Sequence, residues 1–129
     1  MGNTARDIEA VIRTDGRYPP EAYAFLNEGI ARAAHEVYGR VDDDGPHHVT
    51  GQQLCCALRD HAIDRWGPLA GTVLSHWNVH ATIDFGNMVY LMIEHGWMSK
   101  SEEDRLDDFR GVYEFAEAFS HGTEYSFAE

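Results

Sequence analysis

The sequence predicts a mainly α-helical domain with a small β element. Apolar residues recur every three or four positions over several segments of helical length, which is the spacing of amphipathic helices. Shorter stretches at 47–50, 97–98 and 109–115 have the length or the alternation that is typical of strands. The chain has 129 residues, the usual size of one domain, so residues 1–129 are expected to form a single domain.

The first two helices are predicted from their apolar stripes and from the residues at their ends. Residues 4–14 carry an apolar stripe, and Gly16 stops this helix. Pro20 is compatible with the first position of the next helix, and Gly39 ends it. The stripe of this second helix consists of Tyr23, Leu26, Ile30, Ala33 and Val37.

The central part of the chain holds three more predicted helices. Thr50 is suited to cap the first of them, because its hydroxyl can accept a hydrogen bond from a free backbone N–H group. Either Thr82 or Asp84 caps the last, and Gly96 ends it. The three helices are expected over residues 51–65, 69–77 and 82–96.

The segment that follows residue 100 allows two interpretations. Phe109, Gly111, Tyr113 and Phe115 alternate as in a strand. Phe115 and Phe119 lie four residues apart, as in a final helical turn. The residues themselves do not decide between a strand and a helix here.

The predicted elements follow the order found in a winged-helix domain, with one helix too many. A long helix, a short strand, a cluster of helices and a strand–loop–strand unit succeed one another. The expected fold is therefore a winged-helix-like single domain with four to five helices and two to three short strands. Residues 1–4 and 121–129 are expected to be flexible ends.

Acidic residues dominate the charge, with 22 Asp and Glu against 10 Lys and Arg and a formal net charge of −12. Nucleic acid is therefore not an expected partner. The predicted helix 82–96, which would read DNA in a winged helix, contains no Lys or Arg, and the acidic run 101–108 follows it. An atypical nucleic-acid-binding protein stays open as an alternative, because Arg59, Arg65 and Lys100 could gather on one face.

The sequence favours a cytoplasmic protein that does not bind a membrane. The chain does not open with a charged segment followed by an apolar one, and no apolar run approaches the thickness of a bilayer. Cys55 and Cys56 are adjacent, so that a bridge between them would be strained. Reduced thiols in a reducing compartment are therefore expected.

Five segments carry a resemblance to known proteins: RYPPEAYAFLNEGI, HVTGQQL, RWGPLAGTVLSHW, TIDFGNMVYLMIEHG and DDFRGVYEFAEAF. Together they resemble a bacterial family of planctomycete and verrucomicrobial proteins, in register over roughly residues 5–120. That family has no assigned reaction, cofactor or catalytic residue, so the resemblance implies no function for any position. The chain departs from the family pattern at Cys55-Cys56 and in its last ten residues.

Histidines suggest a metal site as one alternative. His76 and His80 lie four residues apart, which places two imidazoles on one face of a continuous helix. Asn78 falls between them and is expected to end the helix, and there is no second pair at ligand spacing. Further ligands could come from His47, His48, Cys55 and Cys56. We expect no cofactor, and a small metal- or thiol-dependent enzyme is kept as an alternative function.

One histidine lies near a carboxylate in the way that orients a general base. His61 and Asp64 are one helical turn apart, but Cys55 and Cys56 lie about one and a half turns away along the same helix. A surface ion pair between His61 and Asp64 is the preferred interpretation. The cysteines lie in an apolar run, so at least one is expected to be buried and inert. No residue is predicted to be catalytic.

The acidic and aromatic C-terminal segment is the candidate contact with a partner. Four aromatic residues of this segment lie among carboxylates: Phe109, Tyr113, Phe115 and Phe119. Large apolar side chains surrounded by charge are suited either to a docking surface or to covering the domain's own core. Winged-helix-like domains without basic character often bind other proteins. The preferred prediction is thus a cytoplasmic interaction or adaptor protein with an unknown protein partner, which these four aromatic residues contact.

Overall fold

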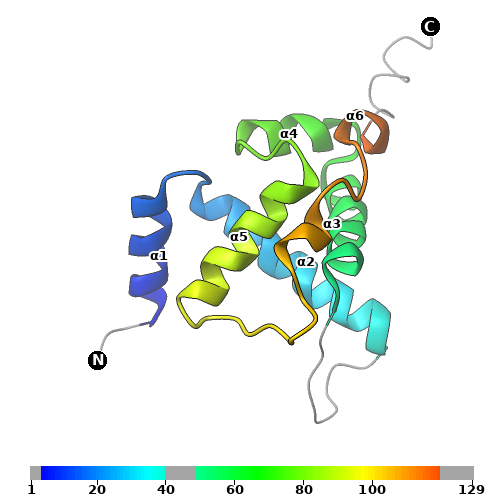
Figure 1. Cartoon of the computed structure of the whole chain (residues 1–129). Coiled ribbons are helices and arrows are strands. Elements are labelled where there is room, and N and C mark those ends of the chain that lie inside the picture. Colours follow the sequence, from blue (N-terminus) through cyan, green and yellow to red (C-terminus); the bar gives the residue numbers. More distant parts are fainter. Residues whose placement is uncertain (1–3, 40–48, 120–129) are drawn as a thin grey trace, which may run out of the picture.

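Helices are the only regular secondary structure in the part of the chain that the structure describes. The computed structural model describes residues 4–39 and 49–119, whose arrangement is shown in Figure 1. These residues form six α-helices and two 3-10 helices, with no β-strand among them. The elements are α1 (Thr4–Asp15), α2 (Pro20–Tyr38), α3 (Gly51–Trp66), η1 (Gly67–Leu69), α4 (Ala70–His76), α5 (Thr82–Glu94), η2 (Leu106–Phe109) and α6 (Phe115–Ala118).

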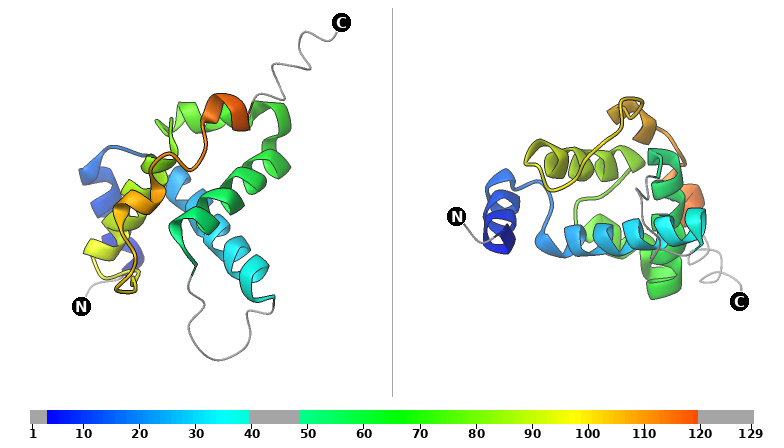
Figure 2. Two further views of the ribbon diagram at one scale, coloured as in Figure 1. Left: turned by 45° about the vertical axis from the view of Figure 1, so that its right-hand side comes forward. Right: turned by 90° about the horizontal axis from the view of Figure 1, so that it is seen from below.

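Helices α2, α3 and α5 surround the core. α2 packs along α3, and the 3-10 helix η2 packs on both α5 and α3 (Figures 1 and 2). α1 packs on α2 at the edge of the molecule. The largest side chains that are fully buried in this core include Phe25, Leu26, Leu58, Phe85 and Met88. Among the helices of the described ranges, none combines the length and the apolar character that a membrane crossing needs.

The predicted ends of α2 and α3 are confirmed. Thr50 Oγ1 accepts a hydrogen bond from the N–H of Gln53 at 3.0 Å, and Gln53 Oε1 accepts one from the N–H of Thr50 at 2.9 Å. This reciprocal pair is a capping box, which satisfies two backbone donors that a helix start leaves free. α2 begins at Pro20, and the N–H of Gly39 closes it by donating to His35 O at 2.7 Å.

The N-cap residue of α5 is Ala81, so the predicted cap at Thr82 or Asp84 is wrong. Asp84 is the third residue of the helix and bonds back to the chain that precedes it. Its Oδ2 accepts hydrogen bonds from the N–H groups of His80 at 2.8 Å and Ala81 at 3.1 Å. Its Oδ1 accepts a hydrogen bond from the Tyr18 hydroxyl at 2.6 Å, which ties the α1–α2 connection to the start of α5. Thr82, the other candidate cap, is buried and serves a different purpose.

The strand predicted at Trp97–Met98 is wrong. Gly96 has a φ of 77°, which is costly for residues with a side chain. The N–H of Gly96 donates to Ile93 O at 3.0 Å, and the N–H of Trp97 donates to Met92 O at 2.9 Å. These two bonds form the Schellman cap that ends α5. Trp97 therefore belongs to the end of a helix.

The strand predicted at 109–115 is also wrong, and the helical alternative for Phe115 and Phe119 is confirmed. η2 ends at Phe109, and the N–H of Phe119 donates to Phe115 O at 3.0 Å in α6. A strand needs a neighbouring strand to satisfy its backbone, and no described segment provides one. The aromatic alternation instead reflects a 3-10 helix, a turn and a short α-helix in succession.

The third predicted strand, at 47–50, is not formed in its described half. Val49 and Thr50 belong to no regular element, and Thr50 is extended because it caps α3. His47 and His48 lie outside the described residues, as do the predicted flexible ends except for Thr4, the first residue of α1. Because no described residue is in a strand, no wing can be built from them. The winged-helix-like fold is therefore wrong, and only its mainly helical character is confirmed.

A glycine allows α2 and α3 to approach each other closely. A Cβ atom added to Gly29 would lie only 2.1 Å from Leu58 Cδ2. Leu58 is fully buried, and it cannot move aside without displacing other core side chains, because protein interiors are close-packed. The missing side chain at residue 29 therefore sets the distance between the two longest helices.

We predict that Gly29→Val lowers the free energy of unfolding by about 1–3 kcal/mol, the usual cost of overpacking a core. Urea denaturation followed by far-UV circular dichroism measures this loss. Ala31→Val is the matched control, because Ala31 is exposed on the same helix and its substitution costs only helix propensity, below about 1 kcal/mol. Equal losses in the two variants would show that the close approach at Gly29 does not limit stability.

Candidate functional site

Phe109 fills a notch that two glycines leave open. A Cβ atom on Gly86 of α5 would lie 2.7 Å from Phe109 Cγ, and one on Gly51 of α3 would lie 3.0 Å from Phe109 Cε1. The Phe109 side chain is 5% exposed. It therefore lies between the start of α3 and the middle of α5 and holds η2 against both.

Thr82 supplies the hydrogen bonds that fix the same segment. It is the only buried polar residue among those described, at 1% exposure. Its hydroxyl donates to Phe109 O at 2.6 Å and accepts from the N–H of Val112 at 3.2 Å. One side chain thereby satisfies two backbone groups, one at the last residue of η2 and one just after it.

Tyr113 is tied to α3. Its hydroxyl donates to Cys55 O at 2.7 Å, and the Arg59 guanidinium carbon lies 5.6 Å from the centre of its ring. Burial, more than any neighbouring charge, raises the pKa of the Tyr113 hydroxyl. The phenol is therefore a protonated donor that anchors the segment after η2 to the backbone of α3.

Phe115 and Phe119 pack on each other and on neighbouring helices. Their ring centres lie 5.1 Å apart in an edge arrangement, and the ring of Phe115 lies 6.0 Å from that of Phe85. A Cβ atom on Gly71 of α4 would lie 3.3 Å from Phe119 Cβ. Both rings are half-buried, so each keeps some surface toward solvent.

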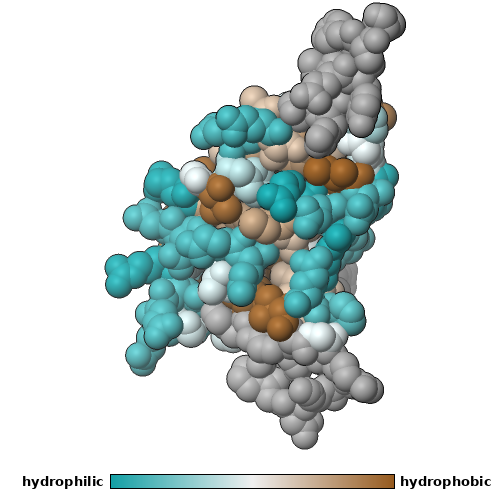
Figure 3. Space-filling view, turned by 90° about the vertical axis from the view of Figure 1, so that its right-hand side faces the viewer, coloured by the Kyte–Doolittle hydropathy of each residue, from teal (hydrophilic) through white to brown (hydrophobic). Residues whose placement is uncertain are grey.

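The four aromatic residues predicted as partner contacts thus have different surroundings. Phe109 is in the core, Tyr113 is tied to α3, and Phe115 and Phe119 lie over α4 and α5. On the side of the molecule where α3 and α6 lie, the described surface is mostly hydrophilic with small separate apolar patches (Figure 3). Phe109 and Tyr113 therefore pack within their own domain, whereas Phe115 and Phe119 each keep a partly exposed ring.

The segment before η2 encloses a pocket, which we call the α3–α5 pocket. It has a volume of about 610 Å3, within the range of about 300–1,000 Å3 for ligand sites. Its apolar lining comes from α2, α3, α5 and the 98–109 segment: Ile30, Leu54, Val89, Ile93, Met98 and Phe109. Its polar lining includes Thr50, Tyr90, Lys100, Ser101, Glu103, Asp104 and Asp108.

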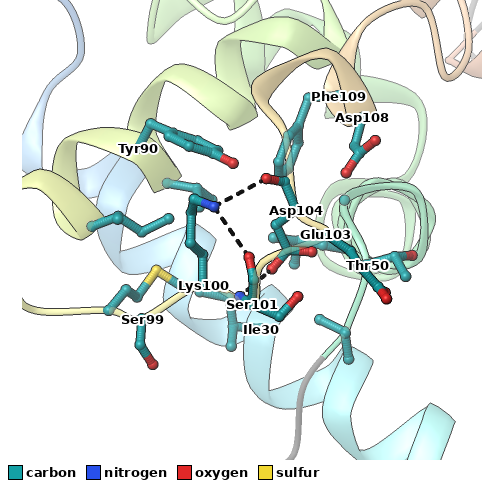
Figure 4. Close-up of a pocket in the computed structure, with 16 residues that line it drawn as sticks. Ile30, Thr50, Tyr90, Ser99, Lys100, Ser101, Glu103, Asp104, Asp108 and Phe109 are labelled. Atoms are coloured by element: carbon teal, nitrogen blue, oxygen red, sulfur yellow. Dashed lines mark hydrogen bonds between the residues drawn. The ribbon is translucent and has the colours of Figure 1, made fainter.

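Lys100 holds the loop on one side of this pocket. Its Nζ donates to the carbonyl oxygens of Ser101 at 3.1 Å and Asp104 at 3.2 Å, as Figure 4 shows. The N–H of Ser101 donates to Asp104 Oδ2 at 2.9 Å. These bonds close the loop 100–104 on itself and fix the direction of the Asp104 carboxylate.

Tyr90 contributes an unpaired hydroxyl to the pocket. The hydroxyl oxygen is buried and has no hydrogen-bond partner in the described structure. Burial first, then the negative charges of Asp104 and Asp108, raise the pKa of Tyr90. A buried hydroxyl without a partner costs about 1–3 kcal/mol, so this phenol lowers the stability of the pocket wall.

A second hollow, which we call the α4–α6 groove, contains the histidines considered as metal ligands. It has a volume of about 680 Å3 and is lined by His76 and His80 together with Phe115 and Phe119. His80 Nε2 lies 3.1 Å from Asn78 Oδ1. In the described part of the chain, no group of three or more His, Cys, Asp or Glu side chains is placed to hold a metal ion.

The predicted ion pair between His61 and Asp64 is wrong. His61 Nε2 lies 2.9 Å from Glu28 Oε1, and Asp64 Oδ2 pairs with Arg32 at 2.8 Å. Helix α2 is packed so closely along α3 that its side chains reach these groups first. Arg65 also pairs with Glu28, at 2.8 Å, and these contacts lower the pKa of the Glu28 carboxyl, with the hydrogen bond to His61 as the main cause.

The two cysteines have different environments. Both thiols are unbridged, with Cys55 buried and Cys56 half-buried. Burial, followed by the nearby thiol of Cys56, raises the pKa of Cys55 to about 12. Cys55 is therefore a protonated, poorly nucleophilic side chain at neutral pH, as the apolar run around it predicts.

The three basic residues that could have gathered on one face to bind nucleic acid each contact a different part of the protein. Arg59 pairs with Asp60 and lies over Tyr113, and Arg65 pairs with Glu28 and lies over Trp66. Lys100 is bound to the carbonyl oxygens of its own loop.

The sequence did not reveal the α3–α5 pocket or the position of Tyr90 in it. The lining residues come from four separate segments, and no local spacing connects them. One signal was present: the acidic run 101–108 is flanked by two apolar residues, Met98 and Phe109, and contains no apolar residue except Leu106. A polar run between two apolar residues is expected to lie on the surface while the apolar residues at its ends pack on the core.

Comparison with protein-family models, with curated proteins and with solved structures gives no match to this chain. The resemblance to a planctomycete and verrucomicrobial family therefore stays a prediction. Any function has to be argued from the pocket and its lining.

We predict that Thr82→Val lowers the free energy of unfolding by about 1–3 kcal/mol, because Phe109 O and the N–H of Val112 both lose their partner. Thr82→Ser keeps the hydroxyl and loses one methyl group, at about 1 kcal/mol. Urea denaturation of the two variants gives the comparison. A serine variant that is as unstable as the valine variant would contradict the anchoring role of the hydroxyl.

We predict that the two thiols differ in reactivity in the folded protein. Ellman's reagent at pH 8 reacts with thiolates, so Cys55 in the Cys56→Ser variant should react slowly until guanidinium unfolds the chain. Cys56 in the Cys55→Ala variant should react without unfolding, because it is only half-buried. Equal rates for both variants under native conditions would be evidence against the buried, protonated state of Cys55.

Proposed function

We propose that this protein is an interaction module that binds a protein partner through the α3–α5 pocket. One observation carries the proposal: an apolar pocket of about 610 Å3 opens between α3, α5 and a loop whose shape is fixed by its own hydrogen bonds. A pre-formed pocket with a mostly apolar surface and polar groups along one side is typical of a binding site. Such a site can receive an anchoring side chain of a partner, as the centres of protein interfaces do.

The positions of the nucleophiles and histidines favour binding over chemistry. Cys55 is buried, and His61 pairs with Glu28 between α2 and α3. His76 and His80 line the other hollow, the α4–α6 groove. None of these four described side chains lines the α3–α5 pocket.

The proposal changes the role of the aromatic residues. Phe109 supports the pocket as part of its wall instead of reaching out to a partner. Phe115 and Phe119 line the α4–α6 groove, which makes that groove the alternative docking site. The two free thiols suit a reducing compartment, and we propose that the module acts in the cytoplasm.

A pair of matched substitutions tests the proposal. Ser101→Trp places an indole at an exposed position that lines the α3–α5 pocket, and Thr72→Trp places one at an exposed position that lines the α4–α6 groove. We expect quantitative mass spectrometry of pull-downs from native lysate to find a protein that wild type and Thr72→Trp enrich and that Ser101→Trp loses. Thermal unfolding checks that all three proteins are folded.

A partner that only Thr72→Trp loses would move the docking site to the α4–α6 groove. Partners that both variants retain would contradict the use of either hollow. Point substitutions are used because a chain truncated after Lys100 would lose Phe109, whose side chain is part of the core.

A further inference from the structure

We propose that the partner segment bound by the α3–α5 pocket is basic: a stretch of peptide with a large apolar side chain next to Lys or Arg. This inference rests on the proposed function and specifies the chemistry of the partner. Two features of the pocket carry it: an apolar interior and carboxylates along one side.

The apolar interior accounts for the anchoring side chain. Ile30, Leu54, Val89 and Ile93 reach the pocket from α2, α3 and α5, and Phe109 forms its wall. The helices that carry these residues pack on the common core. A large aliphatic or aromatic side chain can therefore be buried there without first rearranging the fold.

The carboxylates account for the basic neighbour. Glu103, Asp104 and Asp108 line the pocket on the side of the loop. Asp108 Oδ2 accepts the N–H of Arg105 at 3.0 Å, and Asp104 Oδ2 accepts that of Ser101, so both side chains are held in fixed directions. Lys100, the one cation among the lining residues that the structure describes, is directed to two backbone oxygens of its own loop. Negative charge thus dominates the mouth of an apolar pocket.

The phenol of Tyr90 forms part of the pocket wall. Figure 4 shows Tyr90 beside Lys100 and Phe109 in the pocket. Its hydroxyl oxygen is buried without a hydrogen-bond partner, so a peptide cannot bond to it without displacing the side chains around it. Burial, followed by the negative charges of Asp104 and Asp108, raises the pKa of this phenol.

The extent of the acidic surface favours a peptide over a smaller ligand. Glu102, which is exposed, continues the carboxylates beyond the pocket lining, whereas Asp107 pairs with Arg110 at 3.0 Å. A chain with a net charge of −12 repels a second copy of itself, whereas a basic segment is attracted over the whole approach. Charge complementarity therefore selects a basic protein segment as the occupant.

The test is a selection of a random peptide library on the full chain, with Ser101→Trp as the subtraction arm. We expect the peptides that depend on an open pocket to carry a large apolar residue beside Lys or Arg. One enriched peptide is then synthesised, and fluorescence polarisation measures its affinity. We expect Ser101→Trp to weaken binding at least about tenfold and Glu103→Lys about threefold, as one exposed charge pair implies.

The charge contribution has its own matched controls. Glu114→Lys makes the same change of net charge at an exposed residue outside the pocket, and binding should change less than in Glu103→Lys. A peptide with Lys or Arg replaced by Glu should bind wild type more weakly and recover affinity on Glu103→Lys. Recovery of this kind requires direct complementarity at the pocket, because a general loss of stability cannot produce it.

The outcomes separate the two proposals. Pocket-dependent peptides without Lys or Arg, or binding that Glu103→Lys leaves unchanged, would overturn the basic partner and leave the interaction function standing. The absence of any peptide that Ser101→Trp subtracts would overturn the interaction function itself. A dimer in sedimentation velocity that Ser101→Trp dissociates would identify a second copy as the occupant and would overturn the basic peptide.

Discussion

The insertion of Phe109 between Gly51 and Gly86 is the contact on which the second half of the structure depends. Burying such a side chain contributes about 1.5–3 kcal/mol, and either glycine with a side chain would close the notch. Thr82 satisfies the backbone on both sides of this ring through its hydroxyl. The ring and the hydroxyl together fix the only long irregular segment in the described chain against α3 and α5.

The pocket is a consequence of this attachment. After the Schellman cap at Gly96 turns the chain away from α5, the segment has to return to the notch that Phe109 fills. Lys100 and Asp104 hold the intervening loop in one shape, and the space under it is left between apolar side chains. The acidic residues of the run are therefore placed at the mouth of an apolar pocket. A flexible solvated loop would not fix them there.

Packing matters more than ion pairing between α2 and α3. A row of ion pairs crosses this interface and involves Glu28, Arg32, His61, Asp64 and Arg65. The side chains of Glu28 and Arg65 are each 46% exposed. Exposed pairs contribute about 0–1 kcal/mol each. Close contact at Gly29 and the burial of Phe25, Leu26 and Leu58 contribute more, and the ion pairs mainly decide which side chains face one another.

The sequence by itself determined helices α1 to α5 and several of their ends. The residues that begin or end these helices affect only the neighbouring one or two turns, so their effects can be predicted locally. They are Pro20, Gly39, Thr50 and Gly96. Only the tertiary structure decided the path of residues 97–119, because their backbone and aromatic rings bond to Thr82, Cys55 and the glycine notch, which lie far away in sequence. The partner of His61 was decided in the same way, since Glu28 reaches it from another helix. Spacing along one helix predicts a local pair, whereas a candidate site built from four segments depends on how those segments pack.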